Sequence, residues 1–357
     1  MSASPHRTTS VIAYSLDTYS FHEQVWTVDP NGGGTLFQAH ANIQGWSPDG
    51  RDLLLQDSRI EILDIASGSK RPLPHTRWAE TAVWSPDGQW IAFDASLTRR
   101  ATRSRLYVEH PDGSAFHSVG PVEAPYTSAI SISWSPDSTK LAVLYDATNE
   151  ASGGVWVIPT NGSHIRHLAL MSSGDINEFG ATWSPTANRI VYTCQHRRHR
   201  GAINLEGLPP GSADISQICT FGPPGEAERL LTPRTLWAYD PAWSPSGQQL
   251  AFTGIDFRHH HGKRAIFVIN RDGTDLHRVT PYRDAADFPS WSPDGTQIAY
   301  LGGIDGTQNH VATLDYGLFA VLASGGPERD LVRPNDSSGA WLSNDDGGVT
   351  PIAWQPG

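Results

Sequence analysis

A tryptophan followed by serine and proline recurs along the chain and constrains its fold more than any other feature. Six copies begin at Trp46, Trp84, Trp134, Trp183, Trp243 and Trp291, and a degenerate seventh, Ala-Trp-Gln-Pro-Gly, contains Trp354. Neighbouring copies lie 38 to 63 residues apart. Tandem units of this length predict a repeat architecture, in which each unit contributes its own part of the core. The 357 residues therefore need not divide into several domains.

Each unit contains one segment that carries the motif tryptophan and three further short segments rich in strand-forming residues. After Trp84 these are IAFDA, RLYVEH and FHSVG, and no convincing amphipathic helix interrupts them. Four-stranded units in tandem are typical of β-propeller blades. The N-terminus has three runs without a tryptophan strand, and the C-terminal VTPIAW is a tryptophan strand without the other three. Together they make one blade.

We therefore predict an all-β, single-domain fold: a seven-bladed β-propeller of four-stranded antiparallel blades. The ring closes where the C-terminal strand pairs with the three N-terminal strands, which removes the edge of an open array. The predicted blades are 10–38 with 349–354, then 42–75, 80–120, 130–170, 179–232, 239–280 and 287–333.

The repeated motif itself has the chemistry of a turn. In Ser-Pro-Asp-Gly, which follows Trp46, Trp84 and Trp291, serine suits the first position, proline fixes φ at the second and glycine suits the fourth. The turn joins the innermost strand to the next, and we expect the indole to pack between neighbouring blades. The motif is therefore structural and not a nucleophile elbow, which needs the different spacing G-x-S-x-G.

These Trp-Ser-Pro-Asp-Gly units resemble the TolB-type propeller repeat, which is related to the WD-repeat propellers. The resemblance covers nearly the whole chain and implies the fold, whereas function depends on sites that differ between members of a fold. TolB itself is periplasmic and has a separate α/β domain. The N-terminal sequence here shows neither that domain nor the charged start and apolar core of a secretory signal, so we expect a cytoplasmic protein.

Charge and cysteine content narrow the functional classes. A net charge of −11 argues against general nucleic-acid or membrane-surface binding, and no apolar run is long enough to span a membrane. Cys194 and Cys219 bracket the insert of the fifth blade. A disulfide across neighbouring strands is one interpretation, but in a reducing cytoplasm we favour free thiols.

Basic residues concentrate on the side of the propeller opposite the motif turns. Three loops there, 95–105, 194–217 and 254–264, hold ten of the 26 Lys and Arg residues in 46 positions. Varied loops on a rigid scaffold commonly carry function. We expect Arg197, Arg198 and Arg258 to bind an anionic partner: a small molecule, a sugar acid or an acidic protein surface. The alternative is that these loops are merely solvated.

The same loops are rich in histidine, which is the commonest metal ligand. No cofactor follows with certainty, but a divalent metal ion in the central funnel is one hypothesis. Its candidate ligands are His196, His199, His259 and His310, although their spacing matches no defined metal motif. Exposed histidine-rich loops are the simpler explanation.

The innermost strands predict a ring of side chains near the mouth of the funnel. Four residues before each motif tryptophan stand Asn42, Glu80, Ile130, Phe179, Tyr239, Asp287 and Thr350. Further aromatic residues lie close by on the crossings, at Trp78, Trp237, Phe288 and Trp341. Aromatic side chains with a few polar groups suit a ligand pocket, so we predict that Phe179, Tyr239 and these four contribute to binding. The alternative is that they plug the funnel.

Two functions follow as hypotheses. The favoured one is a binding or scaffold propeller that recognises an anionic ligand or protein partner on its varied face. The alternative is a metal-dependent enzyme in the funnel, such as a lyase or hydrolase acting on an acidic sugar, with Glu80 or Asp287 as acid or base. Oligogalacturonate lyases, a similar propeller family with a histidine-bound metal, are the precedent for the second hypothesis.

Overall fold

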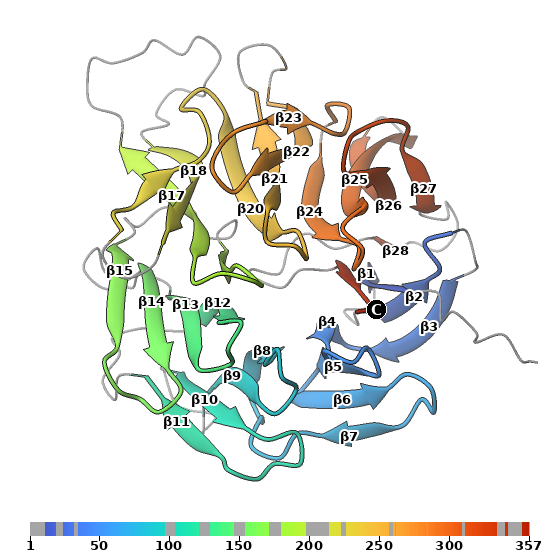
Figure 1. Ribbon diagram of the computed structural model, residues 1–357. Coiled ribbons are helices and arrows are strands. Elements are labelled where there is room, and N and C mark those ends of the chain that lie inside the picture. Colours follow the sequence, from blue (N-terminus) through green and yellow to red (C-terminus); the bar gives the residue numbers. More distant parts are fainter. Residues whose placement is uncertain are drawn as a thin grey trace, which may run out of the picture.

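The strands form seven sheets arranged as blades around a central axis (Figure 1). The structure is a computed structural model that describes residues 11–18, 24–31, 35–96, 104–120, 129–145, 154–170, 180–197, 214–222, 226–256, 260, 262–283, 285–308, 311–333, 340–341 and 352–356. The described strands within each blade are antiparallel. The predicted seven-bladed β-propeller is therefore confirmed.

Each of blades two to seven runs from an innermost strand to an outermost one in chain order. Blade two contains β4 (Asn42–Trp46), β5 (Asp52–Gln56), β6 (Ile60–Asp64) and β7 (Lys70–Pro72). Blade three contains β8 (Ala79–Trp84), β9 (Ile91–Ala95), β10 (Arg105–Glu109) and β11 (His117–Val119). Blade four contains β12 (Ala129–Trp134), β13 (Lys140–Tyr145), β14 (Gly154–Pro159) and β15 (Arg166–Leu170).

The remaining complete blades follow the same order. Blade five contains β16 (Ala181–Trp183), β17 (Ile190–Arg197), β18 (Asp214–Phe221) and β19 (Arg229–Leu230). Blade six contains β20 (Trp237–Trp243), β21 (Gln249–Ile255), β22 (Arg264–Asn270) and β23 (His277–Arg278). Blade seven contains β24 (Ala286–Trp291), β25 (Gln297–Gln308), β26 (Val311–Leu322) and β27 (Arg329–Val332).

Blade one joins the two ends of the chain. Its strands are β1 (Ile12–Thr18), β2 (Gln24–Val28) and β3 (Thr35–His40), and β29 (Ile352–Trp354) pairs with β1 as the innermost strand. A short strand, β28 (Ala340–Trp341), also pairs with the end of β1. Gln355 strengthens the closure, because its backbone N–H donates to the carbonyl of Val11 at 2.9 Å. The predicted closure by the C-terminal strand is confirmed.

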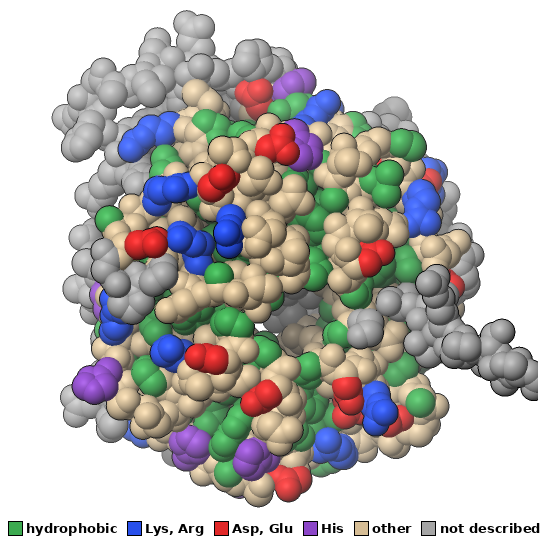
Figure 2. Space-filling view, in the orientation of Figure 1, with side chains coloured by type: hydrophobic (Ala, Val, Ile, Leu, Met, Phe, Trp, Pro, Cys, Tyr) green, Lys and Arg blue, Asp and Glu red, His purple; other side chains and the backbone are tan. Residues whose placement is uncertain are grey.

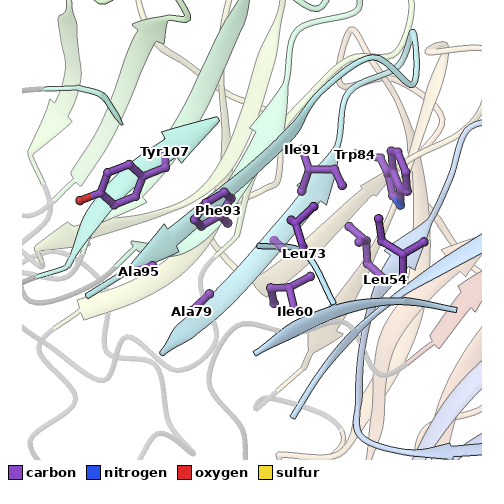
Figure 3. Close-up of a cluster of buried hydrophobic side chains, with 11 residues drawn as sticks. Leu54, Ile60, Leu73, Ala79, Trp84, Ile91, Phe93, Ala95 and Tyr107 are labelled. Carbon is purple, nitrogen blue, oxygen red and sulfur yellow. The ribbon is translucent and has the colours of Figure 1, made fainter. Parts of the chain in front are cut away.

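The motif tryptophans connect each blade to its neighbour. Five indole N–H groups donate to a backbone carbonyl in the innermost strand of the preceding blade: Trp46 to Ala353, Trp134 to Val83, Trp243 to Thr182, Trp291 to Ala242 and Trp354 to Ser290, at 3.0–3.3 Å. Around each indole the core lies between two blades. Figure 3 shows Leu54 and Ile60 of blade two against Trp84 and Phe93 of blade three.

In four copies of the motif, the turn after the tryptophan is held by a hydrogen bond from its serine hydroxyl to its aspartate carboxylate. Ser292 donates its hydroxyl to the Asp294 carboxylate at 2.6 Å, and that carboxylate also accepts the backbone N–H of Thr296 at 3.0 Å. Gly295 closes the turn with a φ of 69°, which glycine adopts without a Cβ clash. The Ser292 hydroxyl also lowers the pKa of Asp294 below its ordinary value. The motif is therefore structural, as its composition predicts.

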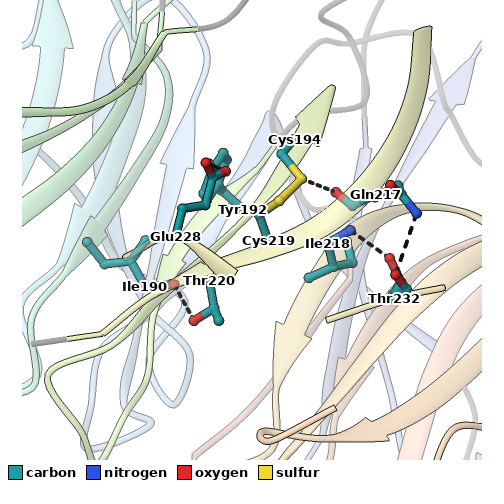
Figure 4. The surroundings of a disulfide bond; sticks show 9 residues. All are labelled: Ile190, Tyr192, Cys194, Gln217, Ile218, Cys219, Thr220, Glu228 and Thr232. Carbon is teal, nitrogen blue, oxygen red and sulfur yellow. Dashed lines mark hydrogen bonds between the residues drawn. A yellow bond between two sulfur atoms is a disulfide. The ribbon is translucent and has the colours of Figure 1, made fainter. Parts of the chain in front are cut away.

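Cys194 and Cys219 form a disulfide, so the expectation of free thiols is wrong (Figure 4). Cys194 lies on β17 opposite Gln217, and Cys219 lies on β18 opposite Tyr192, which brings the two Cα atoms to 5.7 Å. Both cysteines are buried. Disulfides are typical of oxidising compartments, and the expected cytoplasmic location stays a prediction.

The described residues include no helix long and apolar enough to cross a membrane.

Candidate functional site

The centre of the propeller is a channel of about 640 Å³, bounded by the innermost strands and the turns that follow them. Figure 2 shows the hollow at the centre of the disc. Its described lining is apolar and hydroxyl-bearing, with Thr81, Ser133, Thr182 and Ser290 among the polar side chains and Asp240 as the only charged one. The described lining contains no Lys, Arg or His. The volume lies within the range of small-molecule sites in proteins.

Blades six and seven have a strained innermost strand at this channel. Asp240 and Phe288 line it, and they have φ values of 52° and 55°, which residues other than glycine seldom adopt. Each lies at a β-bulge and precedes a proline, Pro241 or Pro289. Strained residues and bulges gather at functional sites, because the surrounding fold must stabilise a conformation that the chain would not choose alone.

Tyr239 and Asp287 directly precede these two residues. Both are buried, and they form a hydrogen-bonded cluster with the half-buried Arg264. The Tyr239 hydroxyl donates to one carboxylate oxygen of Asp287 at 3.0 Å, and the Arg264 guanidinium donates to the other at 2.9 Å. Only 2% of the Asp287 side chain is exposed, compared with 26% of the Arg264 side chain. Burial raises the pKa of Asp287 above its ordinary value, and Arg264 opposes that shift.

A second arginine is held in the same way beside the first. Arg283, on the crossing from blade six to blade seven, donates to the Glu328 carboxylate, which also accepts the hydroxyl of the buried Tyr300. The backbones of Arg264 and Arg283 exchange two hydrogen bonds, of 2.7 and 2.9 Å. Residues paired in this way project to the same side of a sheet. The two arginine side chains, each 26% exposed, therefore start from adjacent points of one surface.

Tyr282, next to Arg283, gathers two more basic side chains. The ring of His260 stacks on it at a centroid distance of 3.7 Å, and the Arg278 guanidinium lies 4.6 Å from its centre. Lys263, directly before Arg264, is exposed. The described basic residues at this junction thus come from the blade-six loop, the end of β23 and the following crossing.

The mouth ring predicted from the sequence is only partly brought together. Tyr239 and Asp287, which occupy equivalent positions in neighbouring blades, are in direct contact. Glu80 is exposed, whereas both oxygens of the Asp287 carboxylate accept hydrogen bonds, so the role of either as acid or base stays a prediction. Trp78 is 37% exposed, with Arg77 at 4.9 Å from its ring. Trp237 is half-buried at the start of β20.

Most of the predicted loop residues cannot be placed in this site. Arg198, Arg258, Phe179, His199, His259 and His310 lie outside the described residues. For Arg197 and His196 on β17, and for Trp341 on β28, only the backbone strand is described.

Arg264 and Arg283 are functional candidates that reasoning from the sequence did not single out. Arg264 belongs to one of the three basic loops, but composition alone does not distinguish it from its neighbours.

The described residues contain one group with the spacing of metal ligands, Cys194, Cys219 and Glu228. Its two sulfur atoms form the disulfide and so offer no thiolate to a metal ion. The hypothesis of a histidine-bound divalent metal therefore rests on residues whose side chains are not described.

Comparison with known proteins extends this picture at the level of the fold. No protein-family model matches the chain. An uncharacterized protein of Agrobacterium fabrum is 26% identical over 196 residues, which span 49% of this chain and 64% of that protein. The match therefore covers less than two thirds of the relative's length.

Solved structures resemble the whole propeller at low sequence identity. Oligogalacturonate lyase from Vibrio parahaemolyticus superposes with a TM-score of 0.62 at 12% identity, covering 90% of this chain and 86% of that one. An oligogalacturonate lyase in complex with manganese gives 0.61 at 14% identity, covering 92% and 86%. TolB from Acinetobacter baumannii gives 0.52 at 13% identity, covering 98% and 83%. The chain is thus a propeller similar in fold to TolB and to oligogalacturonate lyase.

Proposed function

We propose that this protein is a binding propeller that recognises the acidic group of a ligand or protein partner between blades six and seven. The observation that carries the proposal is the pair of anchored arginines. Arg264 and Arg283 are each oriented from beneath by a carboxylate, Asp287 and Glu328, whose side chains are 2% and 12% exposed.

This arrangement favours binding over proton transfer. A carboxylate whose two oxygens already accept from tyrosine and arginine orients the arginine and has no vacant oxygen for a substrate. A guanidinium presents a planar set of donors that match a carboxylate or phosphate, and fixing it in advance reduces the entropy lost on binding. The acidic group would lie at the arginines, because the described channel lining has no cation.

The neighbouring channel suits the uncharged remainder of such a ligand. Hydroxyl groups such as those of Ser133 and Thr182 can donate and accept hydrogen bonds, while Phe288 and the prolines give apolar contact. A sugar acid combines both kinds of group. An acidic peptide segment of a protein partner does so as well, and binding measurements separate the two.

The test is calorimetric titration with a galacturonate oligomer, compared with a neutral galactose oligomer of equal length. We expect the acidic oligomer alone to bind, and the double variant Arg264→Ala with Arg283→Ala to weaken binding at least about 100-fold, as for the loss of two charge-assisted contacts. Arg329→Ala, an exposed arginine on β27, is the matched control and should bind normally. Equal binding of both oligomers, or normal binding by the double variant, would contradict the proposal.

A metal-dependent lyase or hydrolase remains the second candidate, because two of the similar folds are oligogalacturonate lyases and one is described as a complex with manganese. The same oligomer, incubated with the protein and Mn²⁺, would yield an unsaturated product with new ultraviolet absorbance if the protein were a lyase. Product that forms with Mn²⁺ and stops with a chelator would favour the enzyme. Binding without turnover would favour the binding propeller.

A further inference from the structure

Blade five departs from other blades at one place in its core. In blades three, six and seven, an aromatic residue of the third strand stacks on the aromatic residue opposite it in the second strand, at ring-centroid distances of 5.6–5.8 Å: Tyr107 on Phe93, Phe267 on Phe252 and Phe319 on Tyr300. In blade five the residue opposite Tyr192 is Cys219. Cys194, two residues after Tyr192, stands where these three blades have Ala95, Gly254 or Gly302. Two sulfur atoms thus replace a stacked ring at this place.

A carboxylate lies beside the two sulfur atoms. The sulfur atoms of Cys194 and Cys219 and a carboxylate oxygen of Glu228 all lie within 4.8 Å of one another (Figure 4). They come from β17, β18 and the residue directly before β19, so adjacent strands of one sheet hold them in place. The hydroxyl of the buried Tyr192 donates to the Glu228 carboxylate and orients it. Both cysteines are buried and Glu228 is exposed, so the cluster opens to solvent on the carboxylate side.

The carboxylate in this cluster lacks the cation that its counterpart in blade seven has. There Tyr300 likewise donates to Glu328, and Arg283, from the crossing into that blade, neutralises the carboxylate. The crossing into blade five, residues 171–180, contains no Lys, Arg or His. Among the residues that the structure describes, no basic side chain forms an ion pair with Glu228. Blade five therefore combines a carboxylate with two sulfur atoms and has no described side chain that balances a negative charge there.

We propose that reduction of the disulfide converts this cluster into a Zn²⁺ site with Cys194, Cys219 and Glu228 as ligands. A dithiol reductant supplies two electrons and two protons and becomes a disulfide itself, while the bond between the two cysteines breaks and two thiols form. Zn²⁺ then displaces both thiol protons. Two thiolates and a carboxylate suit Zn²⁺, and water takes the fourth tetrahedral position on the exposed side. The ion balances the charge of Glu228, as Arg283 does for Glu328 in blade seven.

The two redox states therefore differ in metal binding. The disulfide offers no thiolate, whereas the reduced pair offers two that are buried in an apolar core. A thiolate in such surroundings is unfavourable unless a cation accompanies it. A hydrogen bond to a ligating carboxylate raises metal affinity, which makes Tyr192 a positioning residue.

Cobalt spectroscopy of the full chain tests the proposal, which does not depend on the anion site. The protein is reduced with dithiothreitol, desalted without oxygen and titrated with Co²⁺, a spectroscopic substitute for Zn²⁺. We expect a sulfur-to-cobalt charge-transfer band that saturates at one ion per chain, disappears when Zn²⁺ is added and is absent while the disulfide is intact. The chain contains 15 histidines, which also bind Co²⁺, so the readout is the sulfur band and not the total metal content.

Two glutamine variants test the role of the carboxylate. Glu228→Gln should weaken Co²⁺ binding at least about 10-fold, because a charged ligand is lost. Glu226→Gln, which alters an exposed carboxylate paired with Arg189, is the matched control and should bind normally. The absence of a sulfur band from the reduced, unaltered protein would overturn the proposal. Equal binding by the two variants would do so as well.

Far-ultraviolet circular dichroism shows whether the reduced chain keeps its blades. If reduction unfolds part of the chain, Zn²⁺ should restore the spectrum, because an ion that binds the folded state stabilises it. A reduced chain that stays unfolded in the presence of Zn²⁺ would contradict the assignment.

Discussion

Replacing Trp291 by phenylalanine measures what one indole contributes to the contact between blades. The Trp291 N–H donates to the carbonyl of Ala242 at 3.0 Å, and the residue is 7% exposed. Trp183 occupies the same place in blade five and is 6% exposed, but its buried N–H finds no acceptor among the described residues. The pair is thus a matched comparison with and without the hydrogen bond.

Both substitutions lose a similar amount of apolar contact, because the two rings are buried to the same degree. Trp291→Phe also leaves the Ala242 carbonyl without its donor, which costs about 1–3 kcal/mol when the group is shielded from water. Trp183→Phe instead removes a donor that is already buried and unpartnered, so its polar contribution is near zero or slightly favourable. We therefore expect Trp291→Phe to cost about 1–3 kcal/mol more than Trp183→Phe.

Urea unfolding followed by far-ultraviolet circular dichroism and by tryptophan fluorescence gives the comparison. The two signals must change together if a single free energy of unfolding is to be assigned. The difference in the free energy of unfolding between the variants is then calculated from the shift in their urea midpoints, provided that the dependence of the free energy on urea concentration is the same in both. Equal costs for the two variants, or a larger cost for Trp183→Phe, would refute the assignment of stability to the indole hydrogen bond.

Three further predictions follow from other features. Replacing Cys194 and Cys219 together by serine should cost about 3 kcal/mol, as estimated for a closed loop of this length, and reductant should then no longer alter urea unfolding of the variant; an unchanged stability would contradict it. Arg264→Ala should cost about 3–5 kcal/mol near neutral pH, because the buried Asp287 carboxylate loses its cationic partner. Without Arg264, the pKa of Asp287 in the folded protein rises further above its value in the unfolded chain. The stability of Arg264→Ala should therefore fall as the pH rises from the unfolded to the folded pKa of Asp287, and a stability loss that is larger at acid pH than at neutral pH would contradict this expectation. Deleting residues 352–356 removes the buried Ile352 and Trp354 from blade one and should lower the Tm by roughly 10 °C or more in a calorimetric scan; an unaltered Tm would show that closure contributes little.

The fold could be predicted because its information is local and repeated. Each Trp-Ser-Pro unit specifies a strand, a turn and an interblade contact within a few residues, and counting complete and incomplete units gives the ring closure. The same count places Tyr239 and Asp287 at equivalent positions, and the structure joins them at 3.0 Å.

The candidate site could not be predicted in the same way, because it depends on contacts between blades that no local sequence pattern encodes. The pairing of Arg264 with Arg283 requires the crossing after blade six to return alongside β22, which is a tertiary relationship. Glu328, which orients Arg283, lies 45 residues further along the chain. From the sequence, a disulfide is one geometric alternative and an expected reducing cytoplasm favours free thiols, whereas the register of β17 and β18 favours the bond.

Closure by the last strand also sets the order in which the protein can be completed during synthesis. β1 to β3 leave the ribosome before the other blades, yet the partner of β1 on its inner side, Ile352–Trp354, is made more than 300 residues later. At cellular rates of translation the inner edge of β1 waits for roughly 15–60 s. During that interval the first blade exposes an unpaired inner strand while the other six assemble beside it. Closure of the ring is therefore a meeting of two strands that are made far apart in time, and until it occurs β1 of a nascent chain can pair with the wrong strand.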